Sequence, residues 1–255
     1  MSTTRNTPLA ARSVLASVLL GTDPPWLPTP QLMRTAELFG ISEGTARTAL
    51  SRMAAADEAE ATAGGYRLVG HLAARQDRQS ASRRATTLPW DGSWELALVD
   101  GDGRRPAAAR AALRDALRQL RFAEVREGVW TRPDNLDPAR TPEAAHVVGE
   151  WCQRWTARPA VEPDLDQLFG LPAWHGEAAD LLDEMGALVG PLDAGDTSAL
   201  APGFVTSAAV LRHLQADPLL PIELLPADWL GDELRSAYDR YDAAYRAVLR
   251  TWLHG

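Results

Sequence analysis

The sequence predicts an α+β protein built from a winged helix-turn-helix, a ferredoxin-like βαββ middle domain and a mainly α C-terminal domain. Three observations carry this prediction. Three short helical segments are followed by a Gly-Gly hairpin, the pattern changes to strand, helix, strand and strand near Trp90, and the chain becomes helical after about residue 160. We place the domains at residues 1–89, 90–160 and 161–255.

The first element is a helix, because apolar residues from Val14 to Leu19 recur at helical spacing. The four prolines of "GTDPPWLPTP" exclude a helix from the connection that follows. A second helix is expected from about Gln31 to Phe39, where Gly40 can adopt the left-handed conformation that ends it. The third helix is expected over Glu43–Ala55.

The stretch "EAEATAGGYRLVG" follows the third helix and predicts a hairpin, because Gly64 and Gly65 separate two β-compatible segments. Three helices closed by a small hairpin make a winged helix-turn-helix. The polar, Arg-rich residues 71–90 are expected to form an exposed helix or a linker.

The middle domain begins with "WELALV", which is typical of a buried strand, and continues with the helix "RRPAAARAALRDALRQL". The segment "FAEVREGVWTRP" predicts two strands around Glu127-Gly128, and "AAHVVGEWCQRW" is expected to supply a further strand. This order suggests a ferredoxin-like unit. The C-terminal domain is expected to hold helices near 176–188, 203–215 and 232–253.

Charge is distributed unevenly along the 255 residues, whose formal net charge is -8. Residues 1–90 hold ten Arg against seven Asp and Glu, residues 91–160 hold eleven against eleven, and residues 161–255 hold five against sixteen. The N-terminal third is therefore the part of the chain suited to a polyanion.

Several classes of site have no support in the sequence. Cys152 is a single cysteine, and the five histidines show no zinc-binding spacing, so no metal site is expected. No nucleophile motif or nucleotide-binding glycine loop is present, so we expect neither catalytic residues nor a cofactor. The apolar run Val14–Leu20 is too short for a membrane span and lacks a cleavage pattern, so we expect a cytoplasmic protein without a membrane partner.

The third helix has an apolar face of Ala46, Ala49, Leu50 and Met53, and its opposite face is polar. Arginine can donate two hydrogen bonds to guanine, and a helix N-terminus favours a phosphate, so this polar face suits a DNA major groove. The alternative is a solvated face of a helical hairpin. The residues expected to bind DNA are Ser42, Gly44, Thr45, Arg47, Thr48, Ser51, Arg52, Gly64 and Gly65.

Three acidic residues argue against DNA binding. Asp57, Glu58 and Glu60 follow the third helix directly, and they would repel phosphate if they faced the duplex.

The chain resembles the PaaX-type repressors of phenylacetate degradation. The resemblance rests on "ARSVLASVLLG", "LMRTAELFGISEGTARTALSRM" and "GGYRLVG" at the start, and on "DPLLPIELLPADWLG" at residues 217–231. The segments "WDGSWELALV" and "GVWTRP" are similar to the family's middle domain, so the likeness covers nearly the whole chain.

The resemblance implies a dimeric repressor that binds a double-stranded operator through residues 1–89 and is released by an aryl-acetyl-CoA thioester or another acyl-CoA effector. Residues 161–255 would serve effector binding and dimerisation. Ala209 and Leu230 depart from the family pattern, which leaves the acyl group open. Candidate effector-binding residues are Arg104 and Arg105, whose guanidinium groups suit CoA phosphates, and Arg212 and Trp229, which match the family's C-terminal pattern.

A second hypothesis belongs to a different functional class. An acyl-CoA-binding protein or a small enzyme can use a winged helix as a protein-interaction module instead of a DNA reader. The dependence of DNA affinity on salt separates the two, because only phosphate contacts release counterions.

Overall fold

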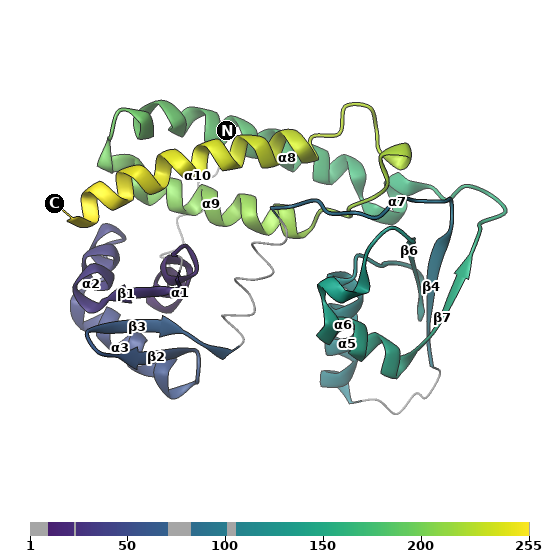
Figure 1. Cartoon of the computed structure of the whole chain (residues 1–255), viewed down its shortest axis with the longest axis horizontal. Coiled ribbons are helices and arrows are strands. Elements are labelled where there is room, and N and C mark those ends of the chain that lie inside the picture. Colours follow the sequence, from purple (N-terminus) through teal and green to yellow (C-terminus); the bar gives the residue numbers. More distant parts are fainter. Residues whose placement is uncertain (1–9, 23, 71–82, 101–105, 255) are drawn as a thin grey trace. The chain divides into compact units, whose positions relative to one another are not determined.

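The computed structural model describes residues 10–22, 24–70, 83–100 and 106–254, and it has the predicted α+β class (Figure 1). The chain divides into two compact units. The first comprises Met1–Arg84, Ala179–Gln215 and Glu233–Gly255, and the second comprises Ala85–Ala178 and Ala216–Asp232. The three domain boundaries given above stay a prediction.

The N-terminal part of the first unit is the predicted winged helix-turn-helix. Its helices are α1 (Ala11–Leu20), α2 (Thr29–Leu38) and α3 (Glu43–Ala55). Their apolar faces meet in a core that includes the fully buried Leu15, Leu19, Leu32 and Leu50. Gly40 has φ +68°, and the chain turns there between α2 and α3 as expected.

The wing is a three-stranded antiparallel sheet in the order β1-β3-β2. Strands β2 (Ala59–Thr62) and β3 (Gly65–Leu68) form the predicted hairpin. Strand β1 (Trp26–Pro28) lies inside the proline-rich connection and pairs with β3, which the sequence reading did not foresee. Prolines exclude a helix there, but they permit a short edge strand.

The middle of the chain forms a four-stranded antiparallel sheet in the order β5-β6-β4-β7. Its elements are β4 (Trp94–Val99), α5 (Ala107–Gln119), β5 (Ala123–Arg126), β6 (Val129–Pro133), the 3-10 turn η1 (Pro138–Arg140), α6 (Pro142–Trp151) and β7 (Cys152–Ala157). Helices α5 and α6 pack on one face of this sheet. The complete order is βαββαβ, the ferredoxin-like arrangement.

The predicted βαββ order was therefore incomplete. Residues 144–155 were expected to form one strand, but α6 occupies them as far as Trp151 and β7 begins at Cys152. Pro142 starts this helix, and Ala144 and Val148 bury one helical stripe four residues apart. The short apolar run could not distinguish a helix from a strand.

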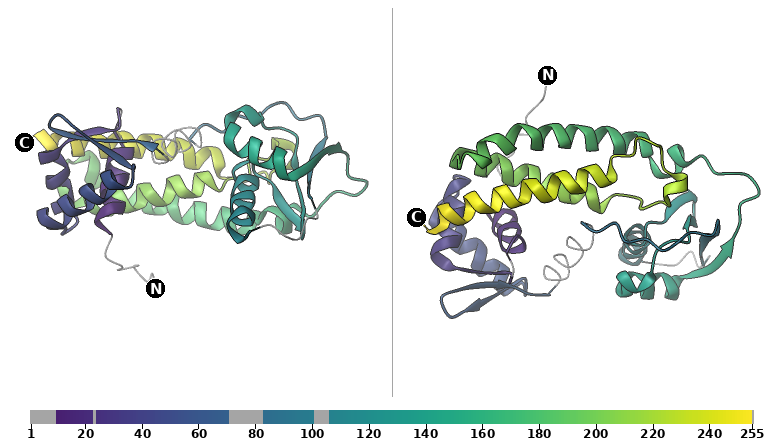
Figure 2. Two further views of the ribbon diagram at one scale, coloured as in Figure 1. Left: turned by 90° about the horizontal axis from the view of Figure 1, so that it is seen from below. Right: turned by 45° about the horizontal axis from the view of Figure 1, so that its top comes forward.

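The predicted C-terminal helices are present and longer than expected. They are α8 (Leu171–Asp193), α9 (Leu200–Gln215) and α10 (Gly231–His254). The same part of the sequence also contains the short α7 (Leu165–Phe169) and the 3-10 turns η2 (Thr197–Ala199) and η3 (Ile222–Leu224). Within the first unit, α9 and α10 run beside the second half of α8 (Figures 1 and 2).

The buried stripe of α10 belongs to the core of the first unit. Leu234, Tyr238, Tyr241, Tyr245 and Val248 are all buried. The hydroxyl of Tyr241 donates a hydrogen bond to the carbonyl oxygen of Gly203 on α9, at 2.8 Å, and burial raises the pKa of Tyr241 to about 12.

The winged helix packs directly on these C-terminal helices within the first unit. The rings of Phe39 and Phe204 lie 4.8 Å apart between centroids, and the guanidinium of Arg34 lies 4.7 Å from the centre of the Trp252 ring. Arg246 donates a hydrogen bond to the carbonyl oxygen of Gly21 at 2.5 Å. Helices α9 and α10 are thus in contact with α2 and with the residues that directly follow α1 and α2.

Candidate nucleic-acid interface

Helix α3 separates its apolar and polar residues as predicted. Ala46, Leu50 and Met53 are 0% exposed and face the core of the winged helix. The predicted contact residues of the opposite face are all exposed, namely Ser42, Gly44, Thr45, Arg47, Thr48, Ser51 and Arg52. The sequence therefore identified a continuous free surface on one helix.

Ser42 caps α3. Its Oγ accepts a hydrogen bond from the backbone N–H of Thr45 at 3.3 Å and shares a second hydrogen bond with the Thr45 hydroxyl at 2.8 Å. The Thr48 hydroxyl donates to the carbonyl oxygen of Gly44 at 2.9 Å. The cap fixes the first turn of the helix. The hydroxyl oxygens can still accept further hydrogen bonds from the solvent side.

Arg47 forms an ion pair with Glu43 one turn earlier on the helix. Its Nε donates to Glu43 Oε1 at 2.8 Å, and both side chains are more than half exposed at 59% and 64%. A pair of this kind contributes only about 0.3–0.5 kcal/mol, so Arg47 can leave it for a stronger partner. Within the described part of the chain, Arg52 makes no ion pair at all.

Two of the three acidic residues behind α3 are neutralised by arginines. Glu58 is buried and accepts a hydrogen bond from Arg12 Nε at 2.7 Å, and this bond raises the pKa of Arg12. Glu60 on β2 pairs with Arg67 on β3. Asp57 alone stays exposed without such a pair among the described residues. The acidic cluster is thus a weaker obstacle to DNA than the sequence suggested.

The two wing glycines occupy different environments. Gly64 is exposed at the tip of the hairpin with φ +85°, whereas Gly65 is buried in the central strand. A Cβ on Gly65 would lie 2.3 Å from the carbonyl oxygen of Leu27, so glycine lets β1 approach β3. This packing explains Gly65 without DNA, and contact of either glycine with DNA stays a prediction.

The candidate effector residues are only partly within the described chain. Arg104 and Arg105 lie outside the described residues. Arg212 is exposed on α9 in the first unit, and Trp229 is half-buried in the second unit. The Trp229 ring stacks on the buried Trp174 ring at 4.3 Å between centroids and an interplanar angle of 20°, which gives this side chain a packing role.

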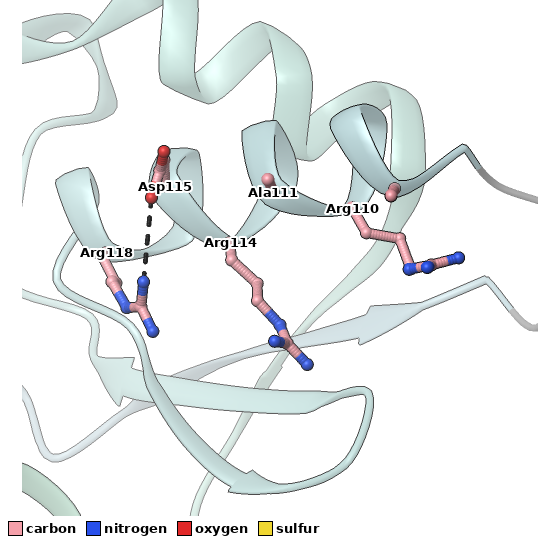
Figure 3. A pocket seen from close by; sticks show the side chains of 6 residues that line it. Arg110, Ala111, Arg114, Asp115 and Arg118 are labelled. Carbon is pink, nitrogen blue, oxygen red and sulfur yellow. Dashed lines mark ion pairs between the residues drawn. The ribbon is translucent and has the colours of Figure 1, made fainter.

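Sequence reasoning missed a row of arginines on α5. Arg110, Arg114 and Arg118 are exposed and lie four residues apart on one face of the helix, which brings their side chains to the same side (Figure 3). They line a surface hollow of about 320 Å³ together with Ala107, Ala111 and Asp115. The spacing was visible in the sequence as "RAALRDALR", but the segment was interpreted only as an Arg-rich helix.

The residues that the structure describes hold neither a membrane-spanning helix nor a metal-binding cluster. No helix there combines the length and the apolar character that crossing a membrane requires. No cluster of three or more His, Cys, Asp or Glu side chains there has the arrangement of a metal site.

Three models of one protein family match successive segments that together make up most of the chain. Residues 10–72 match the model of the PaaX-like protein, residues 87–159 match the PaaX protein central Cas2-like domain, and residues 174–254 match the PaaX-like protein C-terminal domain. None of the curated proteins compared with the chain matches it.

A solved structure of an uncharacterized protein from Mycobacterium tuberculosis is similar over nearly the full length. It shares 40% sequence identity with a TM-score of 0.73, and the similarity covers 95% of this chain and 98% of that one. Because the three family models together cover most of the sequence, the chain belongs to the PaaX family, which is a family of transcriptional regulators.

Proposed function

We propose that the protein is a sequence-specific DNA-binding repressor that leaves its operator when an aryl-acetyl-CoA or another acyl-CoA thioester binds. Phenylacetate catabolism is the pathway that family membership suggests, and the site of action is the cytoplasm. The observation that carries the DNA-binding part is the surface of α3, where the polar residues are exposed as one face and the apolar residues are buried.

In this proposal α3 enters the major groove with Arg47 and Arg52 as its main polar contacts. A bidentate contact between arginine and guanine is worth about 1–3 kcal/mol of discrimination. That is more than the exposed Glu43–Arg47 pair contributes, so the exchange of Glu43 for a base is favourable. The wing turn at Gly64 would lie beside the phosphates.

The test is binding of the purified protein to its own upstream DNA at two salt concentrations, with and without phenylacetyl-CoA and other acyl-CoA esters. We expect salt-sensitive, sequence-specific binding that one ester abolishes. Affinity that does not change with salt would favour the acyl-CoA-binding protein or small enzyme in which the winged helix contacts protein.

The Arg47→Ala variant tests the role of α3. We expect it to weaken operator binding by about 1–3 kcal/mol and to relax the preference at one base pair. The matched control is Arg240→Ala, because Arg240 is an exposed arginine of α10 in the same unit and forms no ion pair within the described chain. An Arg47→Ala protein with wild-type affinity and base preference would refute the assignment of Arg47.

A further inference from the structure

The arginine row of α5, defined as Arg110, Arg114 and Arg118, is not explained by the fold. The apolar side of α5 buries Leu113, Ala116 and Leu117 against the sheet, and the row lies outside that buried stripe. Arg114 has no ion-pair partner among the described residues, and Arg118 pairs only with the exposed Asp115 at 3.7 Å. Ion pairs with described residues therefore leave the charge of Arg114 available and hold Arg118 only weakly.

The extent of the arginine row along the helix axis can be compared with the spacing of phosphates along DNA. Four residues of α-helix rise about 6 Å, so the three arginines span about 12 Å along the helix axis. One strand of duplex DNA carries a phosphate about every 3.4 Å of its axis, so it presents three to four phosphates over the same distance. The positive charge of the row and its extent along the helix thus match the phosphates of one DNA strand.

The lining of the hollow argues against a small-molecule site. It consists of three arginines, two alanines and one aspartate, all from the single helix α5 (Figure 3). Small-molecule pockets enclose most of their ligand between apolar and aromatic walls. Among the described residues, no aromatic side chain lines this hollow, so neither an adenine ring nor an aryl group would find a stacking partner on them.

We infer that the arginine row of α5 binds the phosphate backbone of operator DNA and is a second DNA contact in addition to α3. This inference rests on the proposed function and extends it to the middle domain. The contact carries no base readout, because guanidinium groups that pair with phosphates hold the protein on the duplex without reading its sequence.

The experiment measures the dissociation constant as a function of salt for the full-length protein on its upstream DNA and on an unrelated duplex. For each bound chain, Arg114→Ala is expected to lower the slope of log affinity against log salt by about 0.9, and the Arg114→Ala/Arg118→Ala double variant by about 1.8, on both duplexes. A footprint of the double variant should lose part of its backbone protection while the bases read by α3 remain protected.

The matched control is Arg126→Ala. Arg126 is an exposed arginine of β5 in the same unit, has no ion-pair partner in the described chain and lies outside the row, so its removal should leave the slope unchanged. Thermal unfolding of each variant checks that the fold is intact, which is expected because the substituted side chains are exposed.

Three results would overturn the inference, and they are distinguishable. If the wild-type protein binds no DNA, the proposed function fails together with the arginine row. If the wild type binds but the double variant keeps the same slope and footprint, only the row fails. If the double variant keeps its DNA affinity and loses the response to the acyl-CoA ester, the row binds a small phosphate ligand instead of DNA.

Discussion

At the scale of single residues, the packing of the described fold does not require a glycine at position 44. Gly44 occupies the first turn of α3, it is exposed, and a Cβ added there would meet no atom within 4 Å. Glycine in a helix is less favourable than alanine by up to about 1 kcal/mol. Since the described fold gains nothing from this glycine, close approach of a DNA backbone to the start of the helix would explain it.

Gly44→Ala is therefore expected to separate stability from function. The variant should unfold at the same temperature as the wild type or at a higher one, because alanine is the better helix former. Its operator affinity should fall about tenfold or more, since one charge-assisted hydrogen bond to a phosphate is worth about 1.5–3 kcal/mol. Thermal unfolding and operator titration measure the two quantities.

The control for this variant is Gly186→Ala on α8. Gly186 is also exposed, and its Cβ would also meet nothing within 4 Å, so the substitution should favour the helix without affecting DNA binding. Equal operator affinities for both variants and the wild type would show that the helix start does not approach the DNA.

At the scale of elements, the sheet of the middle domain contains a buried charge cluster. Glu95 on β4 is 4% exposed and lies between Arg132 on β6 and Arg154 on β7. Arg132 is directly opposite Glu95, and Arg154 is two residues away from the position opposite Glu95 on β7. Arg132 Nη2 is 2.7 Å from Glu95 Oε2, and Arg154 contacts Oε1. Burial lowers the pKa of Arg132, although the nearby Glu95 opposes this shift.

Glu95→Ala should strongly destabilise this sheet. It would leave Arg132, which is 2% exposed, buried without its counter-ion, and breaking a buried pair costs about 3–5 kcal/mol. Urea unfolding measures this loss. The control is Glu124→Ala on the exposed side of β5, which should change stability by no more than about 0.5 kcal/mol. Equal unfolding midpoints for the two variants would contradict a structural role for the cluster.

The elements that the sequence predicted well are those with a long periodic pattern. Helix α3 begins and ends at the predicted residues, because Ser42 is a strong cap and the apolar spacing is regular. Strand β1 was missed because three residues flanked by prolines carry no periodicity, and its pairing with β3 is a tertiary contact. Helix α6 was misread because its few apolar residues fit either period.

The features of the candidate site also separate into those that follow from local sequence and those that depend on tertiary contacts. The exposed face of α3 follows from helical geometry alone, so its residues were predictable. The pairing of Glu58 with Arg12 was not predictable, because it joins residues 46 positions apart. The same holds for the burial of Gly65, whose cause is the unpredicted strand β1. The arginine row of α5 was predictable in principle, since its spacing is local.

At the scale of the whole molecule, the contacts of the first unit bear on how the proposed effector response would reach α3. The α1 to α3 bundle touches α9 and α10 through the Phe39–Phe204 and Arg34–Trp252 contacts. A rearrangement of the C-terminal helices would therefore act directly on the part of the molecule that carries α3. No separate transmitting element is needed between them in this unit.

We expect the protein to bind its operator as a homodimer. Helix-turn-helix regulators read two half-sites about 10 bp apart with two copies of the recognition helix, so we expect two chains on each operator. The buried stripe of α10 packs against Gly203 and other residues of the same chain, so the expected dimer would use another surface. Sedimentation should give about twice the chain mass of 27.7 kDa.

Insertion of about half a helical turn, about 5 bp, between the half-sites should then lower the affinity sharply, because the two recognition helices would face opposite sides of the duplex. Insertion of a full turn, about 10 bp, is the matched control for added length. It should restore part of the binding, because the two recognition helices would again face the same side of the duplex. A particle with the mass of one chain, bound equally well to the wild-type operator and to both insertions, would contradict the dimer. In that case α3 and the arginine row of α5 would have to hold the duplex from a single copy.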